Sequence, residues 1–352
     1  MRSRHLTVVF ALVLAVVAAG AVSAASLRAT LEVDRAWLGA QDDVVASVTI
    51  TNDSARTMVV PRWQVPGARL EADLFQVTRD GQPVDYTGML VKRPAPTPAD
   101  FVAIAPGQSI SGRTELSRHY DMANGGEYLV SYRLDLASGN RVAELSSEAE
   151  MAASAAVAIW RDAPVREVID WEAINAAPVP QGLSYTNCSS SQQGSISTAV
   201  NSAKTYATGA KNYLLGKTYS TVGPRYTTWF GAKNSSRFNT TKTHYTNIEN
   251  AFLTKPVVVD CSCTDNYYAY VYPTQPYKIY VCNAFWSAPN SGTDSRAGTL
   301  VHEMSHFNVV ASTDDWAYGQ TACRSLATSN AKKAVDNADS HEYFAENTPS
   351  QN

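Results

Sequence analysis

All five cysteines of this 352-residue chain lie in its second half, from Cys188 onward. Of its 18 tyrosines, 14 also lie from Tyr185 onward, so the two halves differ in composition. A chain of this length is longer than one average domain and shorter than three. Hydrophobic residues make up 45% and charged residues 17%, which excludes disorder, collagen and coiled coil as descriptions of the whole chain. We therefore expect two domains, of which only the second is cross-linked by disulfides.

The N-terminus has the pattern of a secretory signal peptide over residues 1–25. Arg2 and Arg4 precede an apolar run from Leu6 to about Ala21, and the small residues at 22–24 form a cleavage site. A membrane anchor, the alternative, needs about 20 apolar residues, and this run is shorter. We therefore predict a secreted protein without a membrane partner, in which disulfides can form. The net charge of −3 argues against a nucleic-acid partner.

Residues 26–160 alternate between apolar and polar positions, as short β-strands do. Leu27, Ala29 and Leu31 share one face, and turn signals such as Asp80-Gly81 separate the strands, which predicts an antiparallel β-sandwich. Residues 124–130 (NGGEYLV) resemble the tyrosine corner of an immunoglobulin domain, with Val130 where such a domain carries cysteine. The predicted fold is an all-β, Ig-like sandwich. We find no chemistry in it and interpret its His119 as a surface residue.

Residues 161–182 contain three prolines and are predicted to be a linker, so the second domain covers 183–352. Apolar residues at helical spacing predict a helix over 195–215. Further helices are expected at about 242–252, 294–308 and 328–347. Alternation from Tyr268 to Cys282 around Pro276 predicts a hairpin. This domain is therefore predicted to be α+β, rich in helices, with a small antiparallel sheet.

Within the expected helix at 294–308 lies an H-E-x-x-H motif, formed by His302, Glu303 and His306. Residues four apart lie on one face of a helix, so both imidazoles can bind one Zn²⁺ while Glu303 lies beside the open coordination site. Such a zinc ion activates water and polarises a carbonyl group, and the glutamate accepts the proton of the water. The pattern is short, and an amphipathic helix with two solvated histidines is its alternative interpretation.

A catalytic zinc site usually has three protein ligands, and the pattern leaves the third one open. Residues 307–312 do not have the glycine and histidine that would follow in a metzincin. A thermolysin-like site would use a glutamate farther along, for which Glu342 or Glu346 could serve. Asp314 and Asp315 are nearer, eight and nine residues after His306.

Residues 312–319 (STDDWAYG) are similar to the G-T-x-D-x-x-Y-G signature of the aspzincins, the deuterolysin-type metalloendopeptidases. The resemblance implies a zincin-like catalytic domain with Asp315 as the third zinc ligand. It also implies that Tyr318 stabilises the oxyanion of the tetrahedral intermediate. The one departure from the signature is Ser312 in place of its first glycine, which affects a turn residue and not a ligand.

Four further blocks look like the peptidyl-Lys metalloendopeptidase branch of this family, at residues 224–231, 269–273, 284–286 and 337–344. In the last block Asp339 and Glu342 are three residues apart and therefore neighbours on a helix face. The resemblance implies that these carboxylates bind the ammonium of a lysine just after the scissile bond. By spacing alone they would be a solvated acidic helix end. The hairpin from Tyr268 to Tyr280 is expected to form a sheet edge to which extended substrate can add as a strand.

The family pattern also implies two disulfides, Cys188–Cys261 and Cys263–Cys282, with Cys323 as a buried free thiol. Between Lys92 and Lys204 the chain contains no lysine. An enzyme that cuts only before lysine could not release its own catalytic domain near Leu183. We therefore expect a processing protease, or relaxed self-cleavage, to act in the linker. We also expect the lysine-poor first half to offer the enzyme almost no bond that it can cut.

These observations predict a secreted zinc endopeptidase that hydrolyses bonds on the N-terminal side of lysine in protein and peptide substrates, with Glu303 as general base. One alternative is a deuterolysin-like protease with broader specificity for basic proteins. The other, from a different class, is a catalytically inert binding or adhesion protein.

Overall fold

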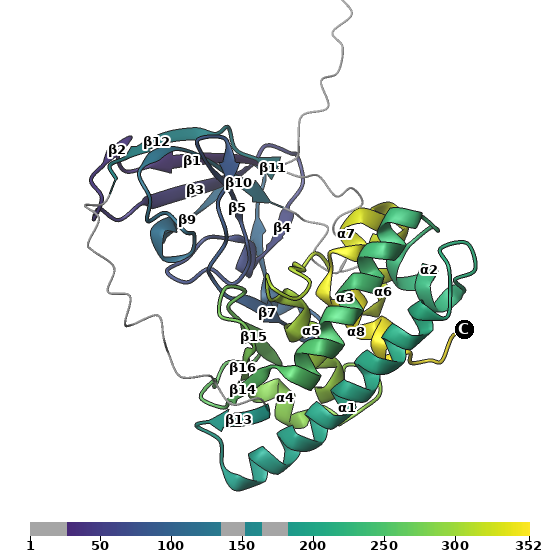
Figure 1. Cartoon of the computed structure of the whole chain (residues 1–352). Coiled ribbons are helices and arrows are strands. Elements are labelled where there is room, and N and C mark those ends of the chain that lie inside the picture. Colours follow the sequence, from purple (N-terminus) through teal and green to yellow (C-terminus); the bar gives the residue numbers. More distant parts are fainter. Residues whose placement is uncertain (1–26, 135–151, 164–181) are drawn as a thin grey trace, which may run out of the picture.

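The computed structural model of the protein describes residues 27–134, 152–163 and 182–352 (Figure 1). The predicted signal peptide and most of the predicted linker lie outside the described residues. In the described ranges, no helix is long and apolar enough to cross a membrane. The buried apolar residues form two separate cores, one drawn from residues 27–159 and one from residues 196–345. We call the corresponding parts the N-terminal β region (27–134 and 152–163) and the C-terminal α/β region (182–352).

The N-terminal β region contains no α-helix in its described residues, as predicted. In its long strands alternate side chains are buried, for example Ala46, Val48 and Ile50 in β3. One core lies between two sheets, of order β1-β3-β9 and β2-β12-β10-β5-β6, and all pairs but β2–β12 are antiparallel. The strands are β1 (Leu27–Val33), β2 (Trp37–Leu38), β3 (Val45–Asn52), β4 (Met58–Pro61), β5 (Phe75–Arg79), β6 (Gln82–Pro83), β8 (Phe101–Ile104), β9 (Ser109–Glu115), β10 (Gly126–Leu134), β11 (Ala152–Ala153) and β12 (Val157–Arg161).

The predicted tyrosine corner is present at the start of β10. The Tyr128 hydroxyl donates a hydrogen bond to the Asn124 carbonyl oxygen at 2.6 Å, and Val130 is fully buried two residues later. The Ig-like topology itself stays a prediction. The interpretation of His119 as a surface residue was wrong, because the turn after β9 packs its side chain into the protein, leaving 8% exposed.

The C-terminal α/β region is rich in helices, as predicted, but its sheet is mixed and not antiparallel. β13 (Gly182–Thr186), β14 (Pro256–Asp260) and β16 (Lys278–Val281) run parallel to one another. The reason is that helices connect β13 to β14, and a crossover of this kind returns the chain in the same direction. Only β15 (Ala269–Val271) is antiparallel to β16, as the two arms of the predicted hairpin. The helices are α1 (Ser190–Leu215), α2 (Pro224–Phe230), α3 (Ser235–Thr254), α4 (Asn283–Ser287), α5 (Arg296–His306), α6 (Gln320–Ser329), α7 (Ala331–Val335) and α8 (Ala338–Glu346).

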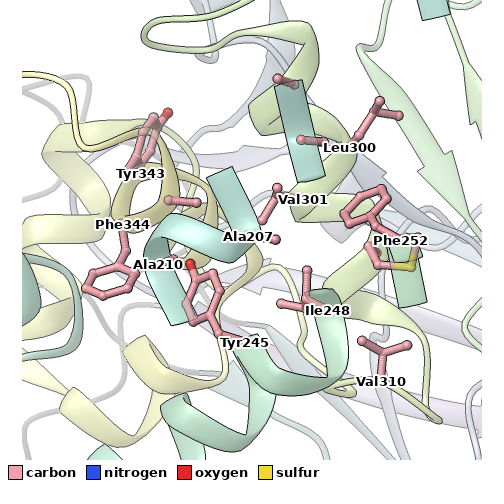
Figure 2. Close-up of a cluster of buried hydrophobic side chains, with 14 of the residues drawn as sticks. Ala207, Ala210, Tyr245, Ile248, Phe252, Leu300, Val301, Val310, Tyr343 and Phe344 are labelled. Carbon is pink, nitrogen blue, oxygen red and sulfur yellow. The ribbon is translucent and has the colours of Figure 1, made fainter. Parts of the chain in front are cut away.

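Helices α1, α3, α5 and α8 contribute to the part of the larger core that Figure 2 shows in close-up. Small residues on α1, among them Ala207 and Ala210, are fully buried and let the neighbouring helices approach closely. Ile248 of α3, Val301 of α5 and Phe344 of α8 fill the space between them (Figure 2). This packing fixes α5, the helix that carries the H-E-x-x-H motif, at the centre of the region.

The single helix predicted over 328–347 is in fact interrupted. α7 ends at Val335, and α8 begins at Ala338. At the break the Asn337 side-chain oxygen accepts hydrogen bonds from the backbone N–H groups of Trp316 and Ala317. The chain is thus held at the break by hydrogen bonds between the Asn337 side chain and another segment, and the helix is not continuous.

Both disulfides implied by the family pattern are present. Cys188–Cys261 joins the ends of the neighbouring parallel strands β13 and β14, and Cys263–Cys282 ties the next loop to the end of β16. Cys323 is a free and buried thiol. The cysteine-rich half is therefore the cross-linked half, as the sequence indicated.

One strand of this sheet comes from the other half of the chain. β7 (Leu90–Lys92) pairs antiparallel with β15 and completes the order β13-β14-β16-β15-β7. In Figure 1 the blue β7 runs beside the green β15, at the place where the N-terminal β region meets the C-terminal α/β region. The sheet edge that we expected to receive an extended substrate thus holds a segment of the protein itself.

Candidate active site

The motif helix α5 is held by its partner α8. The Ser295 hydroxyl caps α5 by accepting a hydrogen bond from the N–H of Gly298, and it donates to Oε1 of Glu346. A Cβ atom on Gly298 would lie 2.2 Å from Oε1 of Glu346, so only glycine allows this approach. Every residue of α5 from Ala297 to His306 is buried. The two histidines therefore project into the protein and not into solvent.

The structure brings His302, His306 and Asp315 together. The Nε2 atoms of the two histidines lie 3.1 Å apart, and the Asp315 carboxylate oxygens lie 3.3 Å from Nε2 of His302 and 3.5 Å from Nε2 of His306. Neither oxygen of Asp315 has a hydrogen-bond partner among the described residues. Two imidazoles and one carboxylate that converge in this way could supply the three protein ligands of a catalytic zinc site.

A tight turn after α5 returns the chain so that Asp315 faces the histidines. Ser312 has a φ of 52°, in the left-handed region that favours glycine. This conformation explains why the family signature has glycine at this position. The Thr313 N–H donates to the Ser305 carbonyl oxygen, and the hydroxyls of these residues lie 2.6 Å apart. These hydrogen-bonding groups hold the turn in place although serine replaces the glycine of the signature.

The other ring nitrogens also have partners, which orient the rings. Nδ1 of His306 lies 2.8 Å from the Thr313 carbonyl oxygen, and Nδ1 of His302 lies 2.8 Å from Oδ1 of Asp339. A proton on each Nδ1 leaves each Nε2 free as a metal ligand. Thus Asp339, expected only in the lysine pocket, also contacts a histidine of the metal cluster.

The charges in the cluster depend on burial and on neighbouring charged groups. Burial raises the pKa of Glu303 to about 8 and lowers the pKa of His306 to about 4. Burial also acts to lower the pKa of His302, but Asp315 and Asp339 outweigh it and raise that pKa to about 10. The Glu303 carboxylate makes no hydrogen bond within the described part of the chain. It is a buried carboxyl group beside the ligand cluster.

Of the other candidate third ligands, Asp314 and Glu346 belong to no metal-ligating group with the histidines among the described residues, whereas Glu342 forms a second such group with His302 and Asp339. Asp314 lines a cavity with Asp73 and Asp336 and does not join the cluster. Glu346 binds Ser295 at the start of α5. Glu342 and Asp339 lie together on α8, next to His302, and both carboxylates point at the same cation.

That cation is Lys92, the last residue of β7. Its Nζ lies 3.1 Å from Oδ1 of Asp339 and 2.5 Å from Oε2 of Glu342, and its side chain is 1% exposed. The ring of Tyr268 packs against it, with Nζ 5.3 Å from the ring centre. Burial alone would lower the pKa of Lys92, but the two carboxylates outweigh it and raise this pKa well above its ordinary value. The pocket therefore holds a charged lysine.

The peptide bond before Lys92 lies among the other predicted catalytic groups. The Tyr318 hydroxyl donates a hydrogen bond to the Val91 carbonyl oxygen at 3.0 Å. The Lys92 backbone N–H is near enough to the Glu303 carboxylate to act against the rise of its pKa, although the two groups do not form a hydrogen bond. Just before β15 the Tyr268 N–H donates to the Lys92 carbonyl oxygen, and on β15 Tyr270 pairs with Val91. Val91 and Lys92 thus form an extended segment. The peptide bond between them lies at the predicted catalytic groups, with lysine on its C-terminal side.

The sequence reasoning missed Lys92 altogether, and its statement that the first half offers no chemistry was wrong. One signal was available, because Lys92 is the only lysine before Lys204. From the low number of lysines we expected that the enzyme could cut almost no bond in the first half. The structure reverses this interpretation, since the single lysine is the residue that the pocket holds.

Comparison with known proteins agrees with this geometry. The family model described as lysine-specific metallo-endopeptidase matches residues 216–346. An extracellular protease of Aeromonas hydrophila is 44% identical over 97% of this chain and 98% of its own. The chain belongs to the aspzincin family of metalloendopeptidases. A peptidyl-Lys metalloendopeptidase of Grifola frondosa is 37% identical over 88% of each chain.

Membership of the aspzincins confirms the resemblance found in the sequence, and it establishes this chain as a zinc metalloendopeptidase. A solved structure of a zinc peptidase from Grifola frondosa is 50% identical and covers 47% of this chain and all of its own, with a TM-score of 0.45. In this aspzincin the match to the family model contains all of α5, the turn with Asp315 and all of α8. The N-terminal β region, including Lys92, lies outside that match.

Proposed function

We propose that this aspzincin is secreted and cleaves peptide bonds on the N-terminal side of lysine. The observation that supports lysine specificity is the position of Lys92, whose ammonium group lies between Asp339 and Glu342. A compact ammonium can contact both carboxylates in this closed pocket, whereas the planar guanidinium of arginine needs a wider one. Secretion is supported by the N-terminal pattern, the two disulfides and the name of the Aeromonas relative.

In this proposal His302, His306 and Asp315 hold the zinc ion. Zinc bound there would polarise the scissile carbonyl group and lower the pKa of a water molecule. Glu303 takes a proton from the attacking water and delivers a proton to the leaving amine of the lysine. Tyr318 donates a hydrogen bond to the oxygen on which negative charge develops, as it does to the Val91 carbonyl oxygen here. Asp339 and Glu342 bind the lysine side chain, and Asp339 also orients His302.

A set of peptides that differ in one residue tests this function. The processed protein from culture medium should cut a peptide before lysine, and replacement of that lysine by arginine or norleucine should lower kcat/KM by at least about 10²-fold. Equal cleavage of the lysine and arginine peptides would instead favour the broader deuterolysin-like activity. The position of the cut is identified by mass spectrometry of the products.

Zinc and the general base are tested on the same peptide. A chelator should abolish cleavage and added zinc should restore it. Glu303→Gln should lower kcat by about 10²- to 10⁴-fold while zinc content stays at one ion per chain. Glu249→Gln, which makes the same change in charge on α3, is the matched control and should leave kcat unchanged. A zinc-loaded wild-type protein without activity would leave the inert binding protein as the better description.

A further inference from the structure

The two faces of strand β15 have different surroundings. Ala269 and Val271 are fully buried and belong to the larger core. Tyr270, between them, points to the opposite face of the sheet, because successive side chains of a strand alternate, and it is partly exposed. An extended peptide that pairs with β15 therefore presents its side chains in turn to the core face and to the face of Tyr270.

The paired strand β7 shows which side chain meets which face. Lys92 pairs with Ala269 and points to the core face, where its ammonium reaches the two carboxylates of α8. Val91 pairs with Tyr270, and its side chain is fully buried. Directly opposite residues of antiparallel strands have Cβ atoms about 4.5–5.5 Å apart. The residue before the lysine therefore has Tyr270 as its cross-strand neighbour.

The ring of Tyr270 is held in place by other tyrosines on this face. It stacks on Tyr280, its partner on β16, with ring centres 4.6 Å apart and an angle of 5° between the planes. Tyr272 meets both rings edge-on, with ring centres 5.8 Å from Tyr270 and 5.9 Å from Tyr280. A side chain that is already ordered loses little conformational entropy when a ligand packs against it. The three rings thus form a preorganised aromatic surface beside the residue that precedes the lysine.

We propose that Tyr270 is a second specificity residue of the protease and selects the residue on the N-terminal side of the scissile bond. The side chains that it favours there are apolar and either β-branched or aromatic. This inference rests on the proposed function, because Val91 takes the position of that residue only if the enzyme cuts before lysine. It adds a binding site on the face of the sheet opposite to the lysine pocket.

The contact with Tyr270 should be weaker than the contacts in the lysine pocket. Lys92 is enclosed with two carboxylates, whereas the ring of Tyr270 is partly exposed. A cross-strand pair of an aromatic and a β-branched side chain contributes modestly, and a pair of aromatic rings contributes more. The residue before the lysine should therefore rank the lysine bonds of a substrate by rate, while lysine itself remains the requirement.

Peptides that differ only in the residue before the lysine test this inference. The secreted protein and its Tyr270→Thr variant are compared on peptides with glycine, valine or phenylalanine at that position. Threonine suits a strand and removes the ring. In wild type, kcat/KM should rise in the order glycine, valine, phenylalanine, by about five- to tenfold in all, and in Tyr270→Thr this ratio should fall to about two or less. Because the flexibility of the glycine peptide affects both proteins equally, the change in the ratio measures the contact with the ring.

Two further variants separate this contact from a general effect on the protein. Tyr270→Phe keeps the ring and should keep the ratio. Tyr219→Thr makes the original substitution at an exposed tyrosine between α1 and α2 and should leave the ratio unchanged, and thermal unfolding checks that each variant folds. Equal kcat/KM for the three peptides in wild type, or an unchanged ratio in folded Tyr270→Thr, would overturn the inference and leave lysine specificity intact. If no peptide is cut before lysine, the proposed function fails and the inference with it.

Discussion

At the scale of single residues, the proposed role of Tyr318 in stabilising the oxyanion can be tested by substitution. Its hydroxyl reaches the Val91 carbonyl oxygen, the position of a scissile carbonyl in the proposed function. A hydrogen bond that strengthens as the oxygen becomes negative lowers the barrier more than it aids binding. We expect Tyr318→Phe to lower kcat on a lysine peptide by about 10²-fold with a much smaller change in KM. Steady-state kinetics of the processed enzyme measure both, and a change confined to KM would contradict the assignment.

Asp339 and Glu342 are predicted to differ, although they contact the same ammonium group. Only Asp339 also lies 2.8 Å from His302, and its Oδ2 accepts a hydrogen bond from the Gly319 N–H. Glu342→Gln should lower kcat/KM for lysine peptides by about 10²-fold, because one carboxylate partner of a buried cation is lost, and zinc content should stay full. Asp339→Asn should lower both zinc affinity and kcat/KM. If both variants retain zinc equally well, Asp339 has no role in orienting His302.

At the scale of elements, the contact between α5 and α8 depends on the ionisation of Glu346. Burial raises the pKa of this carboxyl to about 7 from its ordinary 4.5. Between pH 4.5 and 7 the folded state holds a proton that the unfolded state releases, so the free energy of unfolding should fall as pH rises through this window. The loss from this group is at most about 3 kcal/mol. In Glu346→Gln the free energy of unfolding should change less between pH 5 and pH 7, by about 2 kcal/mol, as measured by denaturant unfolding at these two pH values.

Elements with a strong local pattern could be predicted from the sequence, and those decided by distant contacts could not. The apolar spacing of α1 and the motif on α5 are local. The prediction for α5, 294–308, is close to its observed bounds, and the prediction for α1, 195–215, has the observed end but misses its first turn, which begins at Ser190. The break before α8 depends on Asn337 binding the backbone of Trp316, a residue 21 positions away. The parallel pairing of β13 with β14 depends on the helices between them. Neither appears in the periodicity of the segment itself.

The metal cluster and the lysine pocket could be predicted for a related reason. His302, His306 and Asp315 lie within one short stretch whose spacing reflects the geometry of zinc binding, and Asp339 and Glu342 lie on one helix face. Lys92 lies 247 positions from Asp339, and no spacing rule connects them. Its pairing with β15 exists only after both regions have folded.

At the scale of the whole molecule, the position of the only lysine before Lys204 determines how the chain can be processed. A protease that cuts before lysine has no site in residues 164–181, so separation of the two regions there requires another protease or relaxed self-cleavage. The cut should precede Gly182, because β13 begins there and pairs with β14. We expect the secreted Glu303→Ala protein to be cut at the same bond as wild type, as found by N-terminal sequencing of the C-terminal fragment. Accumulation of uncut Glu303→Ala chain would show instead that the enzyme processes itself. A wild-type fragment that begins at Lys92 would show that the protease also hydrolyses the Val91–Lys92 bond.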